Sequence, residues 1–258
     1  MSYISLIPEM LQTEHICCAI SDKKCANGYI AKKRWLADQH SKGYRFTRLD
    51  ERGKVFIEYG PGEHAWMPVI APNWMVMGCF WVSGKFKGHG HGKALLQSAL
   101  DDAKAQGFAG LTTVVGKKKM HFQSDGKWLL RQGFQKVDEL ENGFVLLALS
   151  VKPDAKVEMP RFAESARAGL DANSKGVTAY YSNRCPFTEF HIENSLKESC
   201  EKRDLPLKTI KLDSLEVAQS APTPATIFSL FLDGKFITTD VSVCMDSRFD
   251  KIVDKAMK

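Results

Sequence analysis

Hydrophobic positions in the first 150 residues follow two periods, one typical of strands and one typical of helices. Residues 74–82 are almost continuously apolar, as expected of a central strand that is buried on both faces. Residues 93–106 instead repeat apolar side chains at helical spacing and stop at Gly107, which suits the end of a helix. Shorter apolar runs predict strands at residues 15–20, 44–49, 54–59, 111–115, 135–137 and 144–149. The order indicates alternating α and β structure.

Two more helices are predicted in this first part. Residues 22–40 form a helical stretch that we expect to be interrupted at Gly28, because glycine is a poor helix former. A second helix starts at Ser124 or Asp125, either of which suits the N-cap, and ends before Gly133.

The pattern changes after residue 150. Residues 151–175 show no sustained period and predict a linker, with a short helix at 161–170. Strands follow at 176–181 and 207–211, helices at 187–202 and 246–257, and a hairpin joins 226–232 to 236–239 across Asp233-Gly234. We therefore expect three regions: a first domain at 1–151, a linker at 152–175 and a smaller domain at 176–258.

Composition places the chain among ordinary globular proteins. Its 258 residues are 44% hydrophobic and 26% charged, and no run approaches the roughly 18 apolar residues of a membrane span. The first residues contain no secretory signal pattern. Seven cysteines without a regular framework indicate reduced thiols, so we expect a cytoplasmic protein that does not bind membranes.

Positive charge is concentrated in the first part. Residues 176–258 carry 11 Lys and Arg against 12 Asp and Glu, so the remaining 25 basic and 18 acidic residues give the first part a net charge of +7. Such a balance favours an anionic ligand. No nucleic-acid motif accompanies the charge, and we expect a phosphorylated small molecule instead of nucleic acid.

A glycine-rich loop separates the apolar strand from the helix at 93–106. Gly88, Gly90 and Gly92 stand at every second position, and Lys87 and Lys93 flank them. Glycines let a phosphate approach the backbone amides that a helix N-terminus leaves unpaired. The spacing is neither Gly-x-Gly-x-x-Gly nor Gly-Lys-Ser/Thr, which excludes the dinucleotide and P-loop signatures. A tight surface turn is the alternative.

This loop resembles the Gln/Arg-x-x-Gly-x-Gly/Ala signature of the GNAT N-acetyltransferases, with Lys87 in the place of Gln/Arg, and the order of elements over residues 11–150 is also similar. The resemblance implies a mixed α/β (α+β) sheet with flanking helices and acetyl-CoA as the acetyl donor. It implies that the coenzyme A pyrophosphate binds at Lys87, Gly88, His89, Gly90, His91, Gly92 and Lys93. It also implies that the pantetheine arm pairs with the strand edge at Phe80, Trp81 and Val82.

The chain departs from the family pattern where a tyrosine often protonates the leaving thiolate. Leu129 stands at that position with Trp128 before it, and neither can donate a proton to sulfur. A base must also take the ammonium proton of the attacking amine. Glu58, Glu63 and His64 are the candidates by position, each with the alternative of a solvated loop residue. Tyr59, Trp66 and Trp74 are candidates for the wall of the acceptor pocket.

Cys185 precedes Pro186 at the predicted start of the helix at 187–202. A helix N-terminus and the neighbouring Arg184 both favour thiolate, so a reactive thiol is one hypothesis, and an inert thiol in a structural or dimerising module is the other. The order of elements resembles the thioredoxin fold, which implies a cis peptide before Pro224. Thr188 stands where a second cysteine would close a disulfide. Cys-Pro-Phe-Thr and residues 218–222 resemble the YoaP-like domain, a C-terminal partner of GNAT domains.

No metal site is predicted. Cys17, Cys18 and Cys25 lack the Cys-x-x-Cys spacing and a completing Cys/His set, so we interpret them as buried thiols. The side chains of His89 and His91 are expected to be exposed in the glycine loop.

Together these features predict an N-acetyltransferase that moves an acetyl group from acetyl-CoA to an amine of a small molecule. Two alternatives stay open: a thiol-dependent binding or redox protein that works through Cys185, and a coenzyme A-binding scaffold without catalysis. A homodimer is left open as well.

Overall fold

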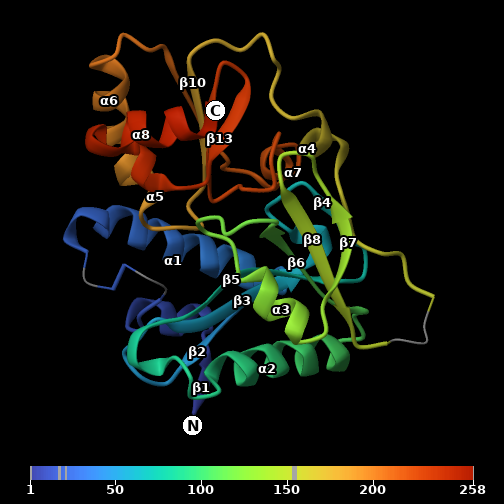
Figure 1. Cartoon of the computed structure of the whole chain (residues 1–258). Helices are drawn as coiled ribbons and strands as arrows, with labels where there is room; N and C mark the ends of the chain where they lie inside the picture. Colours follow the sequence, from blue (N-terminus) through green and yellow to red (C-terminus); the bar gives the residue numbers. More distant parts are fainter. Residues whose placement is uncertain (1, 17–18, 21, 153–155, 258) are drawn as a thin grey trace.

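The computed structural model describes residues 2–16, 19–20, 22–152 and 156–257. The N-terminal part is built on one seven-stranded sheet, and the C-terminal part on a four-stranded sheet that lies beyond helix α1 (Figure 1). The large sheet has the order β1-β2-β3-β5-β6-β8-β7. Its strands are β1 (Tyr3–Ser5), β2 (Arg45–Leu49), β3 (Val55–Pro61), β5 (Met75–Val82), β6 (Gly110–Gly116), β7 (Gln135–Glu139) and β8 (Phe144–Ser150).

The two central strands of this sheet form a fork. β5 and β6 are its parallel neighbours, and they pair only where Met75 meets Leu111 and Val76 meets Thr112. β5 continues to pair with β3 as far as Val82, while β6 continues to pair with β8. The edge of β5 over residues 77–82 therefore faces β6 without ladder hydrogen bonds to it. The Met77 carbonyl accepts a hydrogen bond from the Thr113 hydroxyl, and polar backbone groups of residues 78–82 along that edge are available to a ligand.

Helices cover both faces of the large sheet. α2 (His91–Ala105) packs on one face through the apolar positions that the helical spacing predicts, which are Leu95, Leu96, Ala99 and Ala103. α3 (Gly126–Arg131) is capped by the side chain of Asp125, as expected. On the opposite face, α4 (Glu164–Ala168) packs with the two-stranded ladder of β4 (Val69–Ile70) and β9 (Arg161–Phe162).

The C-terminal sheet has the order β11-β10-β12-β13. β10 (Val177–Tyr181) runs parallel to β11 (Leu207–Lys211) and antiparallel to β12 (Phe228–Leu232), which pairs with β13 (Lys235–Thr238). Between β10 and β11 the chain is helical through α5 (Thr188–Phe190), a π-helical turn (His191–Leu196) and α6 (Lys197–Glu201). α7 (Leu215–Gln219) and α8 (Asp246–Met257) complete this part. The predicted hairpin turn is confirmed, because Asp233 and Gly234 have φ of 47° and 77°.

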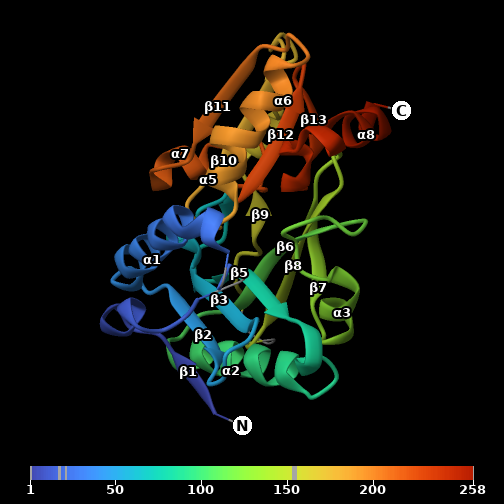
Figure 2. The same cartoon turned by 90° about the vertical axis from the view of Figure 1, so that its left-hand side faces the viewer.

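The two parts share one apolar core. α1 (Ala26–His40) lies between them, and the views of Figures 1 and 2 agree on this arrangement. Trp35 of α1 packs in one cluster with Phe46 and Phe56 of the large sheet and with Tyr180 and Phe231 of the small one. The contact between the parts is therefore buried like a domain interior.

Two expectations about elements are wrong. α1 passes through Gly28 without interruption. Of residues 15–20, those that the structure describes are not in a strand, and residues 17–18 lie outside the described part. The region predicted as a linker contains the short helix expected there, α4, and it packs on the large sheet, since Phe162 is 1% exposed and its strand β9 pairs with β4.

Candidate active site

The glycine loop presents unused backbone donors at the N-terminus of α2. Gly88 and Gly90 have φ of 82° and 80°, a conformation that L side chains rarely adopt, and a Cβ added to either would meet no atom within 4 Å. Within the described part of the chain, none of the amides of residues 88–93 donates a hydrogen bond to the protein. An open loop of unused N–H groups at the positive end of a 15-residue helix suits a phosphate.

The two histidines of this loop have different environments. His89 is exposed, as expected. His91 is 5% exposed, so the expectation that its side chain is exposed is wrong. Its Nδ1 lies 2.9 Å from the hydroxyl of Tyr3, and its ring packs edge-on against Phe86. The His91 side chain thus anchors the loop to β1, and only its backbone amide is directed to a ligand.

Aromatic side chains border the loop and the fork. Phe80 of β5 packs against Trp128, and a Cβ added at Gly92 would lie 3.3 Å from the Trp128 ring. Trp81 is 48% exposed. Leu129, at the position where the family often has tyrosine, is fully buried in the core of the large sheet. That position therefore supplies packing and no proton donor.

Glu58 lies at a bulge of the β3–β5 ladder. Ile57 pairs with Phe80 and Tyr59 with Met77, so two residues of β5 oppose Glu58. Its carboxylate accepts a hydrogen bond of 2.5 Å from the Nζ of Lys32 on α1 and one of 3.1 Å from the hydroxyl of Tyr44. Lys32 and Glu58 are each 1% exposed. Burial raises the pKa of Tyr44 well above its ordinary value, and the Glu58 charge adds to the rise, so Tyr44 stays a neutral donor.

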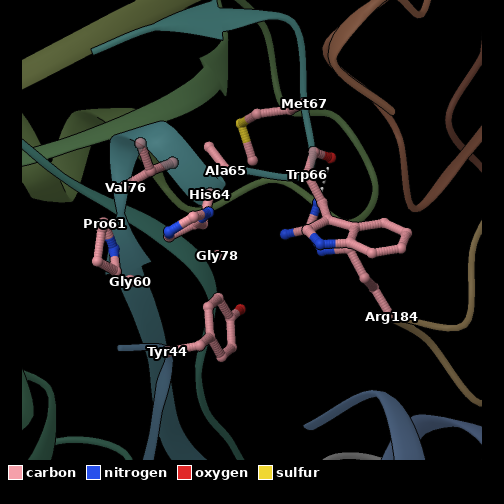
Figure 3. A pocket seen from close by; sticks show the side chains of 10 residues that line it. All are labelled: Tyr44, Gly60, Pro61, His64, Ala65, Trp66, Met67, Val76, Gly78 and Arg184. Carbon is pink, nitrogen blue, oxygen red and sulfur yellow. Dashed lines mark hydrogen bonds between the residues drawn. The ribbon is translucent and has the colours of Figure 1, made fainter. Parts of the chain in front are cut away.

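A small pocket lies beside the fork, between the two parts of the chain (Figure 3). Its wall comes from β3, β5 and the segment after β3, together with one side chain of the C-terminal part. The lining residues are Tyr44, Gly60, Pro61, His64, Ala65, Trp66, Met67, Val76, Gly78 and Arg184. The cavity volume of ≈ 10 Å³ is about the room of one water molecule. Val76 stands at the last β5–β6 pair, so the pocket begins where the fork opens.

Arg184 enters this pocket from the loop after β10. The side chain is 4% exposed, and its Nη1 donates to the carbonyl of Trp66 at 3.1 Å and to Thr226 Oγ1 at 3.0 Å. Its guanidinium carbon lies 5.9 Å from the centre of the Trp35 ring. The sequence suggested Arg184 only as a neighbour of Cys185, and no sequence signal indicated that it reaches the first part.

The three candidate bases are separated by the structure. His64 lines the pocket, and its Nδ1 is buried without a hydrogen-bond partner in the described part of the chain. Glu58 lies behind the pocket, in contact with Tyr44. The carboxylate of Glu63 is outside it, since Glu63 is exposed and accepts a hydrogen bond from the amide of Asn73.

The three aromatic residues predicted for the wall of an acceptor pocket lie in different places. Trp66 lines the pocket. Trp74 is fully buried and donates to the carbonyl of Glu158, and Tyr59 donates to Asp102 of α2 on the other face of the sheet.

Cys185 lies in the core of the C-terminal part and is not among the residues that line the pocket. It is 8% exposed, packs in the apolar core of the small sheet and is in no disulfide. Thr188 is fully buried and its hydroxyl donates to the carbonyls of Ser182 and Cys185, so it closes the turn instead of acting as a second thiol. The peptide before Pro224 is trans, because the described residues contain no cis peptide bond, so the implied cis peptide is wrong.

Cys25 is one of the three cysteines interpreted from the sequence as buried thiols. Cys25 is 1% exposed, and burial raises its thiol pKa to about 11, while Cys17 and Cys18 lie outside the described residues. Among the described residues no cluster of three His, Cys, Asp or Glu side chains has metal-site geometry. Nor does any described helix have the length and apolarity needed to cross a membrane.

Comparison with known proteins agrees with this geometry. A model of the acetyltransferase (GNAT) family matches residues 9–121, and a YoaP-like model matches residues 206–251. The uncharacterized N-acetyltransferase YoaP of Bacillus subtilis (strain 168) is 39% identical over 254 residues, covering 98% of this chain and 99% of that protein.

Solved structures with similarity to the chain include two acetyltransferases. A putative GNAT acetyltransferase from Desulfovibrio desulfuricans has 14% identity and a TM-score of 0.42, and covers 58% of this chain and 98% of its own. The paiA N-acetyltransferase from Thermoplasma acidophilum, in complex with coenzyme A, has 16% identity and a TM-score of 0.39. The match covers 58% of this chain and 99% of the paiA chain. The assignment is carried by the full-length relative and the family match: the chain belongs to the GNAT N-acetyltransferase family and is an acetyl-CoA-dependent acyltransferase.

Proposed function

We propose that the chain transfers the acetyl group to an amine of a small molecule that binds in the pocket between its two parts. The observation that carries this proposal is the position of the pocket, which starts at the β5–β6 fork and is closed on its far side by Arg184. A wide groove would admit a polypeptide, whereas this wall favours a small acceptor.

Acetyl-CoA, when bound, supplies an activated thioester carbonyl. The residues fit its binding: the amides of 88–93 suit the pyrophosphate, and the edge of β5 at Phe80, Trp81 and Val82 suits the pantetheine amides. Lys87 and Lys93 are exposed beside the loop and add positive charge.

His64 is the base that we propose for the ammonium proton of the acceptor. It is the one of the three candidates whose ring faces the pocket, and its Nδ1 has no competing partner in the described part of the chain. The Glu58 carboxylate is held by Lys32 and Tyr44, so we assign it to keeping Tyr44 and α1 in place. No tyrosine occupies position 129, and the thiolate of coenzyme A is expected to leave without a proton from that helix.

The acceptor needs more room than the closed pocket provides. The pocket holds one water-sized group, which is about the size of the reacting amino group. The rest of the molecule is accommodated if residues 63–66 move. These residues are attached to the C-terminal part by hydrogen bonds from Gln219 to the carbonyls of Glu63 and Ala65, and from Thr226 to that of Trp66.

For the C-terminal part we infer a thioredoxin-like fold that serves as a wall and not as a redox centre. The order β11-β10-β12-β13, with helices between β10 and β11 and after β13, supports the fold. The burial of Cys185 and the capping role of Thr188 support a structural thiol.

The test is coenzyme A release from acetyl-CoA with a panel of small amines and, separately, of peptides with free N-termini. We expect small amines to be substrates, and His64→Ala to lower kcat by about 100-fold or more with acetyl-CoA affinity unchanged. Added imidazole should restore part of the activity of His64→Ala. Turnover of peptides alone contradicts the small acceptor, and full activity of His64→Ala contradicts the assigned base.

A further inference from the structure

Arg184 is a buried cation whose charge has no carboxylate partner in the described part of the chain. No described Asp or Glu carboxylate forms an ion pair with the Arg184 guanidinium within 4.0 Å, although the side chain is only 4% exposed. The nearby Glu58 carboxylate is taken by Lys32. Lys32 and Glu58 pair with each other, so no described carboxylate balances the Arg184 charge. A buried excess charge favours an anionic ligand.

Only one nitrogen of the Arg184 guanidinium donates hydrogen bonds to described residues. Nη1 makes both of its hydrogen bonds, to Trp66 and Thr226, while Nε is buried without a partner and Nη2 donates no hydrogen bond to any described residue. Nε and Nη2 form the edge that binds a carboxylate through two parallel hydrogen bonds. The guanidinium carbon also lies 5.9 Å from the centre of the Trp35 ring, within range of a cation–π interaction.

The unused edge is directed toward the reaction site. A Cβ built on Gly78 would lie 3.1 Å from Nη2 and 2.7 Å from the hydroxyl of Tyr44, so both groups converge on the β5 bulge beside the fork. Figure 3 shows the guanidinium end pointing into the space that His64 and Tyr44 also face. The absence of a side chain at Gly78 keeps this space open.

We propose that Arg184 binds a carboxylate of the acceptor through Nε and Nη2, and that the substrates are therefore amines that carry a carboxylate, as amino acids do. This inference rests on the proposed function and names its substrate class. It makes Arg184 a specificity-determining residue that the C-terminal part contributes to the acetyltransferase site. Arg184 and His64 line the same small pocket, which favours a carboxylate only a few bonds from the reacting amine.

Kinetics with matched pairs of amines tests the proposal. Glycine, β-alanine and 4-aminobutyrate are compared with methylamine, ethylamine and propylamine, which lack only the carboxylate, and 2-aminoethylphosphonate is the tetrahedral-anion arm. We expect the carboxylate member of at least one pair to have a kcat/KM about 10- to 100-fold higher, a preference that Arg184→Gln removes. Equal or better turnover of every neutral member, a preference for the phosphonate, or a preference that persists in Arg184→Gln overturns it.

A matched variant controls for loosening of the interface. Gln219→Ala removes hydrogen bonds between the two parts without touching the guanidinium and should keep the carboxylate preference. If Arg184→Gln does not fold, Arg184→Lys keeps the charge but not the two-pronged edge, and its KM for the carboxylate amines should rise while its acetyl-CoA affinity stays.

A binding measurement separates this inference from the proposed function. Propionate and propionamide are added to the full chain and its melting temperature is recorded. Saturable stabilisation by propionate alone, lost in Arg184→Gln and kept in Gln219→Ala, supports the anion site even if no amine of the panel is acetylated. Stabilisation that is absent, or unchanged in Arg184→Gln, overturns it even if amines are acetylated.

Discussion

Replacing Gly28, in the first turn of α1, by alanine tests how closely the two parts of the chain pack. An alanine Cβ at this position would lie 2.2 Å from the carbonyl oxygen of Pro186, a contact shorter than real Cβ atoms make. Pro186 would have to retreat by about 1 Å. Its neighbours resist this, because Arg184 and Thr188 are each fixed by two hydrogen bonds. We therefore expect an overpacking cost near the upper end of the usual range, about 2–3 kcal/mol.

Helix propensity acts in the opposite direction. Replacing a helical glycine by alanine stabilises a helix by about 1 kcal/mol when nothing else changes. The net expectation for Gly28→Ala is thus a loss of about 1–2 kcal/mol in the free energy of unfolding, measured by urea titration. Asn27→Ala is the matched control, because Asn27 is exposed on the same turn. This variant should be as stable as the wild type or more stable by about 0.5 kcal/mol.

The same substitution should change catalysis in one parameter. Pro186 is two residues from Arg184, so its displacement moves the guanidinium in the pocket and raises KM for the acceptor. The acetyl-CoA site that we propose lies at the glycine loop and the edge of β5, so the affinity for acetyl-CoA should stay unchanged. A Gly28→Ala variant as stable as the wild type, or more so, refutes the tight contact between α1 and the C-terminal part.

Three further changes test the site and its support. Glu58→Gln leaves the Lys32 ammonium buried without its anion, so urea titration should show a loss of about 3–5 kcal/mol in the free energy of unfolding. The double variant Lys32→Met/Glu58→Leu should be about as stable as the wild type. Unchanged stability of Glu58→Gln with lost activity would instead point to Glu58 as the base. Gly90→Asp places a carboxylate at the N-terminus of α2, where we propose that the phosphates of acetyl-CoA bind. Calorimetry should show an acetyl-CoA affinity reduced by about 10-fold or more. An unchanged affinity contradicts the proposed phosphate loop. The hydrogen bond from Arg203 lowers the pKa of Asp250 in the folded state. The stability that this bond contributes is present above the unfolded pKa of Asp250 and is lost as the pH falls through the acid range, so Arg203→Gln should flatten the decline of the urea midpoint below about pH 4. An equally steep decline in Arg203→Gln contradicts the role given to this hydrogen bond.

Sequence patterns predicted the elements whose stability comes from their own periodicity. The spacing of apolar residues in α2 and the continuous apolar run of β5 are local signals, and both elements form where they were expected. Such signals were insufficient for β4 and β9, which are two residues each and exist because they pair with each other across more than 90 positions. The sequence indicated the short helix in the predicted linker but not the packing of residues 161–168 on the large sheet.

Side-chain environments were less predictable than elements. Gly28 was interpreted through its helix propensity, but its role is to admit the Pro186 carbonyl, and that contact joins residues 158 positions apart. His91 was interpreted as exposed because its neighbours are glycines, whereas β1 brings Tyr3 to its ring. Both errors arise from contacts that no local window contains.

Arg184 illustrates how the joining of two parts can create a site that neither sequence segment announces. The acetyltransferase signature lies wholly in the first part, and the acetyl-donor site that we propose lies there. The wall of the pocket beside the fork is completed by a side chain from the second part, held there by a carbonyl of the first. Because Trp35 and Tyr180 belong to one apolar cluster, separating the parts would expose that core as well as open the pocket. Acceptor recognition and the stability of the interface are therefore coupled through the same few residues, and changes at the interface should alter the acceptor kinetics before they alter coenzyme A binding.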